Sequence, residues 1–489
     1  MNDFHIRVDT SKLEVVQLKI VDGYSSDWSG DVELRLEKTL RFLKGRREVW
    51  LAGTLSNPSA YIAKCFFNGE KQHREYTSEL SGLIELAKRN LACPKLLFTA
   101  KDGQGSIWVV TECIQGAVEL SDIVLSGGES SPSTNFASRF ADTLLTHWRS
   151  GVHQTDAHLR NFLWDGQSIY TIDVGSIHFT KGALSVSKKC TILEEMLGGY
   201  LESFRRDLIH AFTQRCAQLD EAELLSRIES PGFIRRVEQQ EVKNLRRIWK
   251  KSRRDCSQFI KEQDGSRLLI CQRELDPVLI EKLKHAPDDL MEMGQRLKSG
   301  NTCTVQQIEW TGREMVLKRY NPKSVFYQIM HYFMHSRAML SWMNGILLCR
   351  IGIPSVMPLA VVEEYRFGLL NRAYFLMEHF EGEDIRGYLN AQKHRSEIFD
   401  QSINIISSLF KRLRRFRIIH GDLKSKNILI NESGLRLIDV DGLRFFVPAR
   451  RFSRLFRTDF ERFLDNWSDQ PSLRKTLRSR FSDILTPKK

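Results

Sequence analysis

Residues 418–442 read IIHGDLKSKNILINESGLRLIDVDG, and this stretch decides the fold that the chain is expected to adopt. It predicts a polar loop, a short apolar strand at 428–430, a turn, and a second strand that ends in Asp439. Asp422 precedes Asn427 by five residues, and Asn427 precedes Asp439 by twelve. A carboxylate, an amide and a second carboxylate held beside strands can orient a hydroxyl group and ligate a hard metal ion.

The same layout occurs in residues 152–176, which read VHQTDAHLRNFLWDGQSIYTIDVGS. Here Asp156, Asn161 and Asp173 repeat the spacings of five and twelve residues. A single match arises easily by chance, because Asp and Asn are common residues. Two matches that are each flanked by apolar strands indicate a duplication within the chain.

The elements around the two loops follow one order. A strand with a central lysine comes first in each half, Lys64 within 59–67 and Lys318 within 312–320. A helix, two strands and further helices follow, and the polar loop and its second strand come last. Residues 1–50 predict strands and a short helix, without chemistry that can be named. A repeat this long indicates duplicated domains, because solenoid periods are about 20–50 residues.

We therefore expect an α+β fold of two tandem protein-kinase-like domains, residues 1–250 and 251–489. Each should have a small antiparallel-sheet N-lobe and a mostly helical C-lobe. The length allows this, since 489 residues correspond to about two to four domains. With 42% hydrophobic and 27% charged residues, the composition is that of an ordinary globular protein.

The second half carries residue types that fit phosphoryl transfer from a nucleotide. We expect Lys318 to neutralise the nucleotide phosphates, and Asp422 to orient the acceptor hydroxyl or accept its proton. Lys424 is expected to stabilise charge on the transferring phosphoryl group. Asn427 and Asp439 offer the oxygen ligands that Mg²⁺ prefers.

The first half offers a matching set, in which Lys64 binds the nucleotide and Asp156 takes the position of the catalytic carboxylate. Asn161 and Asp173 are its expected Mg²⁺ ligands. The alternative for each carboxylate alone is a loop-capping aspartate, and for each lysine an exposed strand residue.

A family resemblance adds to this interpretation. The segments HGDLKSKNILI and LIDVDG, with VLKRYN, HSRAMLSW and GIPSVMPLAVVEE before them, resemble the bacterial lipopolysaccharide core kinases, which include heptose and 3-deoxy-manno-octulosonic acid kinases. The resemblance is clearest over residues 295–445 and weaker over 60–180. It implies ATP-dependent phosphorylation of a sugar hydroxyl on the lipid-anchored inner core, at the cytoplasmic face of the inner membrane.

The chain departs from the family pattern in several places. Neither half has a G-x-G-x-x-G phosphate loop, and Gln154 stands where the second loop has His420. The resemblance implies that Glu79, on the helix after the first strand lysine, pairs with that lysine in the nucleotide site. Ser341 takes the equivalent position in the second half, and Asp441 replaces a glycine of the usual metal motif. The complete loop favours chemistry in the second half.

The charge of the chain points to anionic partners. The net charge is +13 at pH 7 and the pI is about 9.3, which suits ATP, a glycolipid substrate or an anionic membrane surface. The basic run 246–254 is either a solvated helix face or linker, or an anion contact. Segment 444–462 interleaves Arg with Phe, so it is either a helix with its aromatics packed inward or a lipid-facing helix. No pattern supports nucleic-acid binding.

The nine cysteines are scattered without a C-x-x-C pair, and we expect them to be reduced in a cytoplasmic protein. No signal peptide or membrane-spanning segment is expected. The main alternative to a sugar kinase is a tandem pseudokinase scaffold in lipopolysaccharide core assembly. A further alternative is a small-molecule or protein kinase of the same fold.

Overall fold

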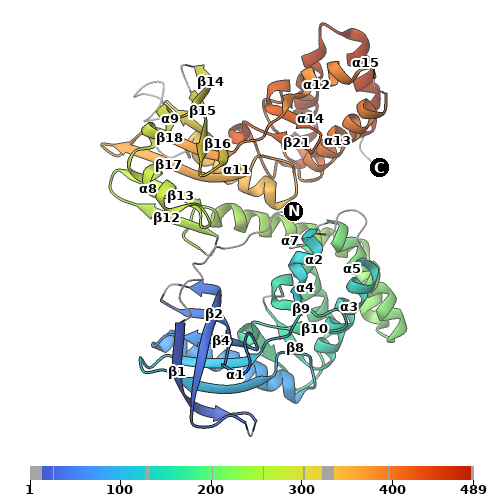
Figure 1. The fold of residues 1–489 in the computed structure, drawn as a ribbon. Coiled ribbons are helices and arrows are strands. Elements are labelled where there is room, and N and C mark those ends of the chain that lie inside the picture. Colours follow the sequence, from blue (N-terminus) through green and yellow to red (C-terminus); the bar gives the residue numbers. More distant parts are fainter. Residues whose placement is uncertain are drawn as a thin grey trace. The chain divides into compact units, whose positions relative to one another are not determined.

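The computed structural model describes residues 14–25, 27–43, 45–126, 133–155, 157–200, 202–256, 258–300, 303–321, 335–394 and 396–485. The chain divides into two compact units, Met1–Glu241 and Val242–Lys489, and the elements of each are labelled in Figure 1. The division falls inside helix α7 (Pro231–Lys251).

The N-terminal unit begins with six antiparallel strands that close into a barrel in the order β1-β2-β3-β4-β6-β5. They are β1 (Glu14–Gly23), β2 (Asp31–Leu43), β3 (Arg47–Gly53), β4 (Tyr61–Phe66), β5 (Leu96–Lys101) and β6 (Ile107–Glu112). The sequence predicted a small antiparallel sheet, with strands and a short helix in residues 1–50. The described part of residues 1–50 is strand and turn instead, and the sheet closes on itself. Bulges in β1 and β2 supply the bending, because an extra residue kinks a strand and lets β1 reach β5.

Helix α1 (Glu70–Lys88) packs outside the barrel, against Phe66 and Val109. A helical region with its own buried core follows. Its helices are α2 (Leu120–Ser126), α3 (Ser133–Arg149), α4 (Val186–Leu197), α5 (Glu202–Gln218), α6 (Ala222–Glu229) and the first part of α7. Its short elements are β7 (Val118–Glu119), β8 (Val152–Gln154), η1 (Leu159–Asn161), β9 (Phe162–Trp164), β10 (Ile169–Thr171), η2 (Val174–Ser176) and β11 (Ile177–Phe179), where η marks a 3-10 turn.

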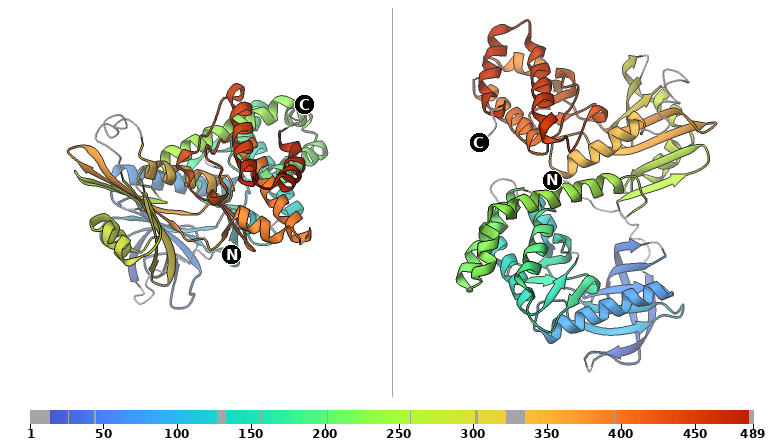
Figure 2. Two further views of the ribbon diagram at one scale, coloured as in Figure 1. Left: turned by 90° about the horizontal axis from the view of Figure 1, so that it is seen from above. Right: turned by 180° about the vertical axis from the view of Figure 1, so that it is seen from behind.

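The C-terminal unit contains an antiparallel sheet of seven strands in the order β12-β13-β17-β18-β16-β15-β14. They are β12 (Phe259–Gln263), β13 (Arg267–Gln272), β14 (Gln295–Gly300), β15 (Cys303–Trp310), β16 (Arg313–Tyr320), β17 (Pro358–Arg366) and β18 (Leu369–Glu378). Helices α8 (Pro277–His285) and α9 (Pro287–Met293) cover one face of the sheet. Helix α11 (Arg337–Arg350) covers the other face (Figure 2).

A second helical region completes this unit around one large core. Its elements are β19 (Glu383–Asp384), α12 (Ile385–Gln392), α13 (Ser396–Arg415), η3 (Ser425–Asn427), β20 (Ile428–Asn431), β21 (Gly434–Leu437), η4 (Val440–Gly442), α14 (Ala449–Leu464), η5 (Asp465–Trp467), α15 (Pro471–Arg480) and α16 (Ser482–Leu485). The helical periodicity of α14 sends its phenylalanines into this core. Its arginines at 450, 451, 454 and 457 are exposed.

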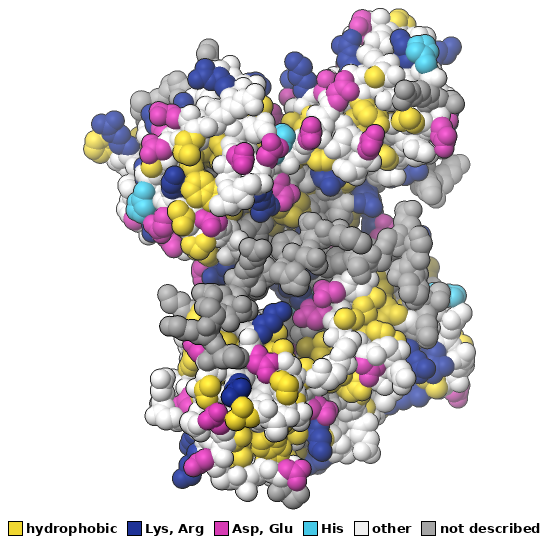
Figure 3. Space-filling view, viewed as in Figure 1, with side chains coloured by type: hydrophobic (Ala, Val, Ile, Leu, Met, Phe, Trp, Pro, Cys, Tyr) yellow, Lys and Arg dark blue, Asp and Glu magenta, His cyan; other side chains and the backbone are white. Residues whose placement is uncertain are grey.

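The basic run 246–254 forms the C-terminal end of α7 and the turn after it. There Arg246 lies over the ring of Phe446, at 5.1 Å from its centroid. On the face shown in Figure 3, basic and acidic side chains are interspersed over both units. All nine cysteines are free. Among the helices that the structure describes, none is long and apolar enough to cross a membrane.

Candidate active site

Lys318 lies on β16, and the alternation of side chains along this strand decides which way it points. Leu317 belongs to the core beneath α8 and α9, whereas Val316 and Tyr320 belong to the core beneath α11. Because successive side chains of a strand point to opposite faces, Lys318 shares the face that α11 covers. It is 4% exposed, forms an ion pair with Asp439 Oδ1, and lies 4.8 Å from the ring centroid of Tyr320.

The loop from Asp422 to Asn427 is closed by its own side chains. Asn427 Nδ2 donates to the backbone oxygen of Asp422 at 2.8 Å, and Lys424 Nζ lies 3.0 Å from the Asp422 carboxylate. The side chains of Asp422 and Lys424 are 51% and 63% exposed, whereas Asn427 is buried. The loop therefore presents a carboxylate and an ammonium group to solvent above a buried amide.

Helix α14 and the turn η5 that follows it hold this loop in place through Asp459 and Asn466. Asp459 Oδ2 accepts a hydrogen bond from the backbone nitrogen of His420 at 2.6 Å, and Oδ1 accepts one from Gly421 at 3.0 Å. Asn466 Oδ1 accepts from the backbone nitrogen of Ser425 at 3.0 Å. Hydrogen bonds to a carboxylate are stronger than neutral ones, so these contacts fix the backbone on both sides of Asp422.

Sequence reasoning missed Asp459, although a signal for it exists. On α14, Asp459 lies three residues after Phe456 and four before Phe463, so it shares their buried face. A carboxylate on an apolar helix face requires hydrogen-bond donors. A search for polar residues in phase with the phenylalanines would therefore have found it.

Asp439 follows β21 and has a left-handed backbone conformation, with φ 59° and ψ 49°. Burial alone would raise the pKa of its carboxyl group, but the nearby ammonium group of Lys318 lowers that pKa below the ordinary value for aspartate. Lys298 and Arg337 act in the same direction. In the described structure only Oδ1 of Asp439 is engaged, by Lys318, which leaves Oδ2 for another partner.

The turn η4 contacts α11 through two side chains of the helix. Asn344 Nδ2 donates to the backbone oxygen of Val440 at 2.9 Å, in a buried position. Arg337 Nε pairs with the carboxylate of Asp441, so the acid that replaces the motif glycine has a helix arginine as its partner.

Helix α11 gives Lys318 no carboxylate partner. Ser341, at the position predicted for the helix acid, forms a buried hydrogen bond of 3.0 Å with the hydroxyl of Tyr320. Lys318 pairs instead with Asp439 across the site. The sequence indicated that the helix partner is missing, but it did not indicate this substitute.

His420 is 1% exposed, and neither ring nitrogen has a hydrogen-bond partner within the described part of the chain. Burial lowers the pKa of His420 against the opposing effect of nearby carboxylates, so the ring is neutral at pH 7. Gln154 in the N-terminal unit is also buried, and its amide atoms likewise lack partners among the described residues.

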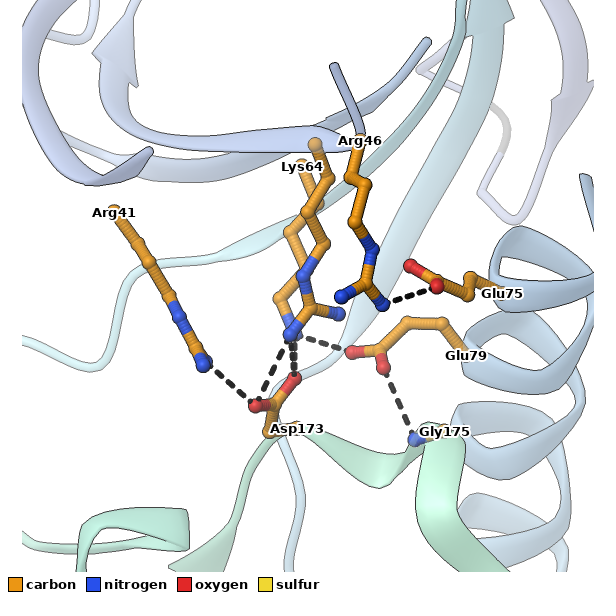
Figure 4. Close-up of polar contacts among 8 residues, drawn as sticks. Arg41, Arg46, Lys64, Glu75, Glu79, Asp173 and Gly175 are labelled. Atoms are coloured by element: carbon orange, nitrogen blue, oxygen red, sulfur yellow. Dashed lines mark hydrogen bonds and ion pairs between the residues drawn. The ribbon is translucent and has the colours of Figure 1, made fainter. Parts of the chain in front are cut away.

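In the N-terminal unit the strand lysine has the helix partner that the resemblance implied. On β4, Tyr61 and Ala63 face the barrel interior, so Lys64 points outward to α1. Lys64 Nζ pairs with Glu79 Oε1, and Glu79 Oε2 accepts from the backbone nitrogen of Gly175 at 3.0 Å (Figure 4). Glu79 is 2% exposed, and it thus joins the strand lysine to η2.

Asp173, which precedes η2, is surrounded by cations (Figure 4). Arg41 Nη1 donates to its Oδ2 at 2.9 Å, Arg47 Nη2 donates to its Oδ1 at 3.1 Å, and Lys64 Nζ lies 3.8 Å from Oδ1. Burial would raise the pKa of Asp173, but Lys64, Arg47 and Arg41 lower it below the ordinary value. Sequence reasoning missed both arginines, and their signal was the basic segment RFLKGRR at 41–47, one strand before the lysine strand β4.

The other predicted residues of the N-terminal site are Asn161 and Asp156. Asn161 is buried at the end of η1, and its backbone oxygen accepts from Ile172 at 2.9 Å. Asp156 lies outside the described residues, so the structure does not place it.

The two units repeat one local geometry at an offset of 266 residues. The hydrogen bond from Ile172 to the Asn161 oxygen has its counterpart from Ile438 to the Asn427 oxygen, at 3.0 Å. Asp173, with φ 56° and ψ 51°, has the left-handed conformation of Asp439. Four pairs of elements begin or end at this same offset: η1 and η3, β9 and β20, β10 and β21, and η2 and η4.

The C-terminal residues fit Mg²⁺ better than the N-terminal residues do. The nitrogen of the Asn427 amide is engaged by Asp422, which leaves its oxygen for a metal, and Lys318 engages only Oδ1 of Asp439, which leaves Oδ2. Asp173, by contrast, already contacts three cations. Within the described residues there is no cluster of three or more His, Cys, Asp and Glu side chains suited to a metal. An ion held by one or two ligands and by substrate phosphates does not need one.

The fold and the site define a mixed α/β protein whose C-terminal unit carries a phosphotransferase-type loop. Residues 284–464 match the lipopolysaccharide kinase (Kdo/WaaP) family, so this part of the chain is similar to that family. No curated protein sequence matches the chain.

Several solved structures resemble the chain. WaaP in complex with acyl carrier protein has 18% identity and a TM-score of 0.30, over 42% of this chain and 88% of that chain. The 2.2 Å crystal structure of WbdD has 16% identity and a TM-score of 0.29, over 46% of this chain and 58% of that chain. The chain thus spans little more than half of WbdD. At TM-scores below 0.5 these likenesses add nothing to the family match.

Proposed function

We propose that the protein is an ATP-dependent kinase that phosphorylates a sugar hydroxyl of the lipopolysaccharide inner core. The observation that carries the proposal is the family match over 284–464, which contains the whole C-terminal set of Lys318, Asp422, Lys424, Asn427 and Asp439. The sugar, the hydroxyl and the use of ATP go beyond that match.

In the proposed reaction each residue of the C-terminal set has one task. Lys318 binds the nucleotide phosphates, and it exchanges its contact with Asp439 for them. The exposed carboxylate of Asp422 orients the acceptor hydroxyl and receives its proton while the acceptor oxygen bonds to the γ-phosphorus and ADP leaves. Lys424, 3.0 Å from that carboxylate, stabilises the charge on the phosphoryl oxygens.

Asn427 and Asp439 are the residues that would hold Mg²⁺. A bound Mg²⁺ ion neutralises phosphate charge during the transfer. Asp459 and Asn466 hold the backbone of the loop that carries both Asp422 and Asn427.

We further infer that the N-terminal unit is a second kinase-like domain, so that the chain is a tandem of residues 1–250 and 251–489. The 266-residue offset supports this, as do the equivalent lysines on β4 and β16. The two compact units of the chain meet between Glu241 and Val242, close to the boundary inferred from sequence.

The substrate is lipid-anchored, and we propose that the protein works at the cytoplasmic face of the inner membrane. The exposed arginines of α14 support an anionic surface contact, because they leave the helix on the side opposite its buried phenylalanines.

A tandem pseudokinase scaffold remains the second candidate function. The specific observation in its favour is that Lys318 has no helix acid and is bound to Asp439, a predicted metal ligand. In such a scaffold this ion pair would be permanent.

The decisive test is transfer of phosphate from radiolabelled ATP to purified core oligosaccharide by the full chain. We expect wild-type turnover to fall by about 10³-fold or more in Asp422→Asn, and to persist in Asp156→Asn. Loss only in Asp156→Asn would assign the chemistry to the N-terminal unit. Absence of transfer by the wild type to any core acceptor would reject the kinase and leave the scaffold.

A further inference from the structure

The N-terminal site has an unusual balance of charge. Four cations from the barrel, Arg41, Arg46, Arg47 and Lys64, face three carboxylates (Figure 4). Two of these carboxylates, Glu75 and Glu79, belong to α1 and pair with Arg46 and Lys64. The third is Asp173, and it receives Arg41, Arg47 and a second contact from Lys64.

The equivalent aspartate in the C-terminal unit has different surroundings. Asp439 contacts one cation, Lys318, and a second carboxylate, Asp441, lies two residues further along the chain. In the N-terminal unit the same place is Gly175, so that second carboxylate is missing. Asp441 is itself paired with Arg337, so Lys318 is the cation paired with Asp439, whereas Arg41, Arg47 and Lys64 all contact Asp173. The two sites thus share a backbone geometry but differ in the number of cations around the equivalent aspartate.

This difference makes Asp173 a poor ligand for Mg²⁺. A divalent cation needs acceptor oxygens in a site of negative charge. Both oxygens of Asp173 are already occupied by guanidinium nitrogens, at 2.9 Å and 3.1 Å. A magnesium ion would have to displace these donors and lie beside three positive groups. Their repulsion of the ion is strong, because the distances are short and the site is partly buried.

The same groups are well suited to phosphate. A guanidinium group has five N–H donors, and in the described structure Arg41 and Arg47 each use one nitrogen. The Nε atom of Arg47 is buried without an acceptor among the described residues. Arginine matches phosphate oxygens through paired donors, so adjacent phosphates would satisfy donors that Asp173 leaves unused.

The source of both arginines also fits a phosphate contact. Arg41 lies near the end of β2 and Arg47 begins β3, so the tip of one hairpin carries both. This hairpin precedes the lysine strand β4, as β14 and β15 precede β16 in the C-terminal unit. In place of glycines whose backbone would cradle phosphates, the tip offers side-chain cations.

We propose that the N-terminal unit binds the phosphate chain of a nucleoside triphosphate through Arg41, Arg47 and Lys64 without a divalent metal ion. In the bound state the phosphates replace Asp173 as the partner of these three cations. This inference rests on the proposed kinase-like character of the unit, but it requires no turnover by either unit.

Calorimetric titration of the full chain with ATP in excess EDTA tests the proposal. We expect one ATP per chain to bind in EDTA, and binding to weaken by roughly tenfold or more in Arg41→Gln/Arg47→Gln. The matched control is Arg74→Gln/Arg227→Gln, which removes two ion-paired surface arginines from the same unit and should leave the affinity unchanged. Inorganic tripolyphosphate, as a second titrant, shows whether the phosphate chain alone suffices.

The variant Asp173→Asn tests the direction of the change in ATP affinity. A general loss of folding would weaken binding and could not produce the expected increase. It should tighten ATP binding in EDTA by roughly fivefold, because one partly exposed ion-pair competitor is removed. Substitution of a magnesium ligand would have the opposite effect: ATP binding would weaken in Mg²⁺ and would not tighten in EDTA. We expect this result for Asp439→Asn in the C-terminal unit.

Three results would overturn the proposal: no ATP binding in EDTA, binding that is indifferent to the double arginine substitution, or weaker binding in Asp173→Asn. None of them depends on phosphate transfer. Conversely, a chain without kinase activity that still binds ATP in EDTA through these arginines would reject only the proposed function.

Discussion

The Nζ atom of Lys318 contacts Oδ1 of Asp439, so the strand lysine is joined directly to the carboxylate that follows β21. Because the pKa of Asp439 is lowered in the folded protein, the unfolded chain takes up its proton first as the pH falls. The stability that this pair contributes is therefore complete above the pKa of an unfolded aspartate, about 3.9. It is lost as the pH falls through the lower, folded value.

Lys318→Met should remove this acid dependence. Without the ammonium group, burial raises the pKa of Asp439. Protonation of this carboxylate then no longer lowers the stability of the folded protein. Urea unfolding midpoints at about pH 6 and about pH 3.5 measure the effect, and their difference should be smaller in the variant. Arg319→Met on the same strand, whose partner is Asp288 rather than Asp439, controls for loss of a paired cation. Equal acid dependence in wild type and Lys318→Met would contradict the assignment.

Asp459→Asn should loosen the catalytic loop. The carboxylate accepts from two consecutive backbone nitrogens, and an amide turns one acceptor into a donor that faces a donor. We expect a loss of about 1.5–3 kcal/mol in the free energy of unfolding, with faster hydrogen exchange at Gly421. Glu461→Gln, on the same helix but partly exposed and paired with Arg478, should cost less than about 1 kcal/mol. If the two substitutions cost the same, Asp459 does not anchor the loop.

Sequence patterns predicted which face of each helix and strand is buried better than they predicted the contacts between these elements. Strand alternation and helical spacing are local properties, so the order of elements and the pairing of Lys64 with Glu79 followed from them and from the family resemblance. The closing of the barrel depends on the pairing of β1 with β5, about 80 residues later in the chain. It also depends on bulges, which no sequence pattern predicted.

The same limit explains the missed charges. Arg41 and Arg47 meet Asp173 because a hairpin curves over the site, and 132 residues separate Arg41 from Asp173 in the chain. Lys318 takes Asp439 as its partner because α11 offers a serine where α1 offers a glutamate. Periodicity shows that a lysine lacks a local partner, but only the tertiary fold selects the substitute.

Glu79→Gln should destabilise the N-terminal unit far more than Glu75→Gln. Glu79 is 2% exposed and bridges Lys64 to the backbone of Gly175, so its loss leaves a largely buried lysine with only its 3.8 Å contact to Asp173. Breaking such a pair costs about 3–5 kcal/mol. Glu75 pairs with an arginine whose side chain is 44% exposed, and its loss should cost about 1 kcal/mol or less. Hydrogen exchange of peptides covering β4 and α1 reports on this unit alone, and similar exchange in both variants would contradict the bridge.

Gly82→Ala should also destabilise this unit, although alanine favours a helix over glycine by about 1 kcal/mol. An added Cβ atom at Gly82 would lie 2.7 Å from the backbone oxygen of Val174 and 2.8 Å from its Cγ2 atom. Helix α1 and η2 approach so closely here that overpacking should cost about 1–3 kcal/mol. The exposed neighbour Ser81, changed to alanine, controls for helix propensity and should be neutral or stabilising. Urea unfolding with hydrogen exchange at η2 compares the two, and a stabilised Gly82→Ala variant would show that helix α1 does not seat η2 through this contact.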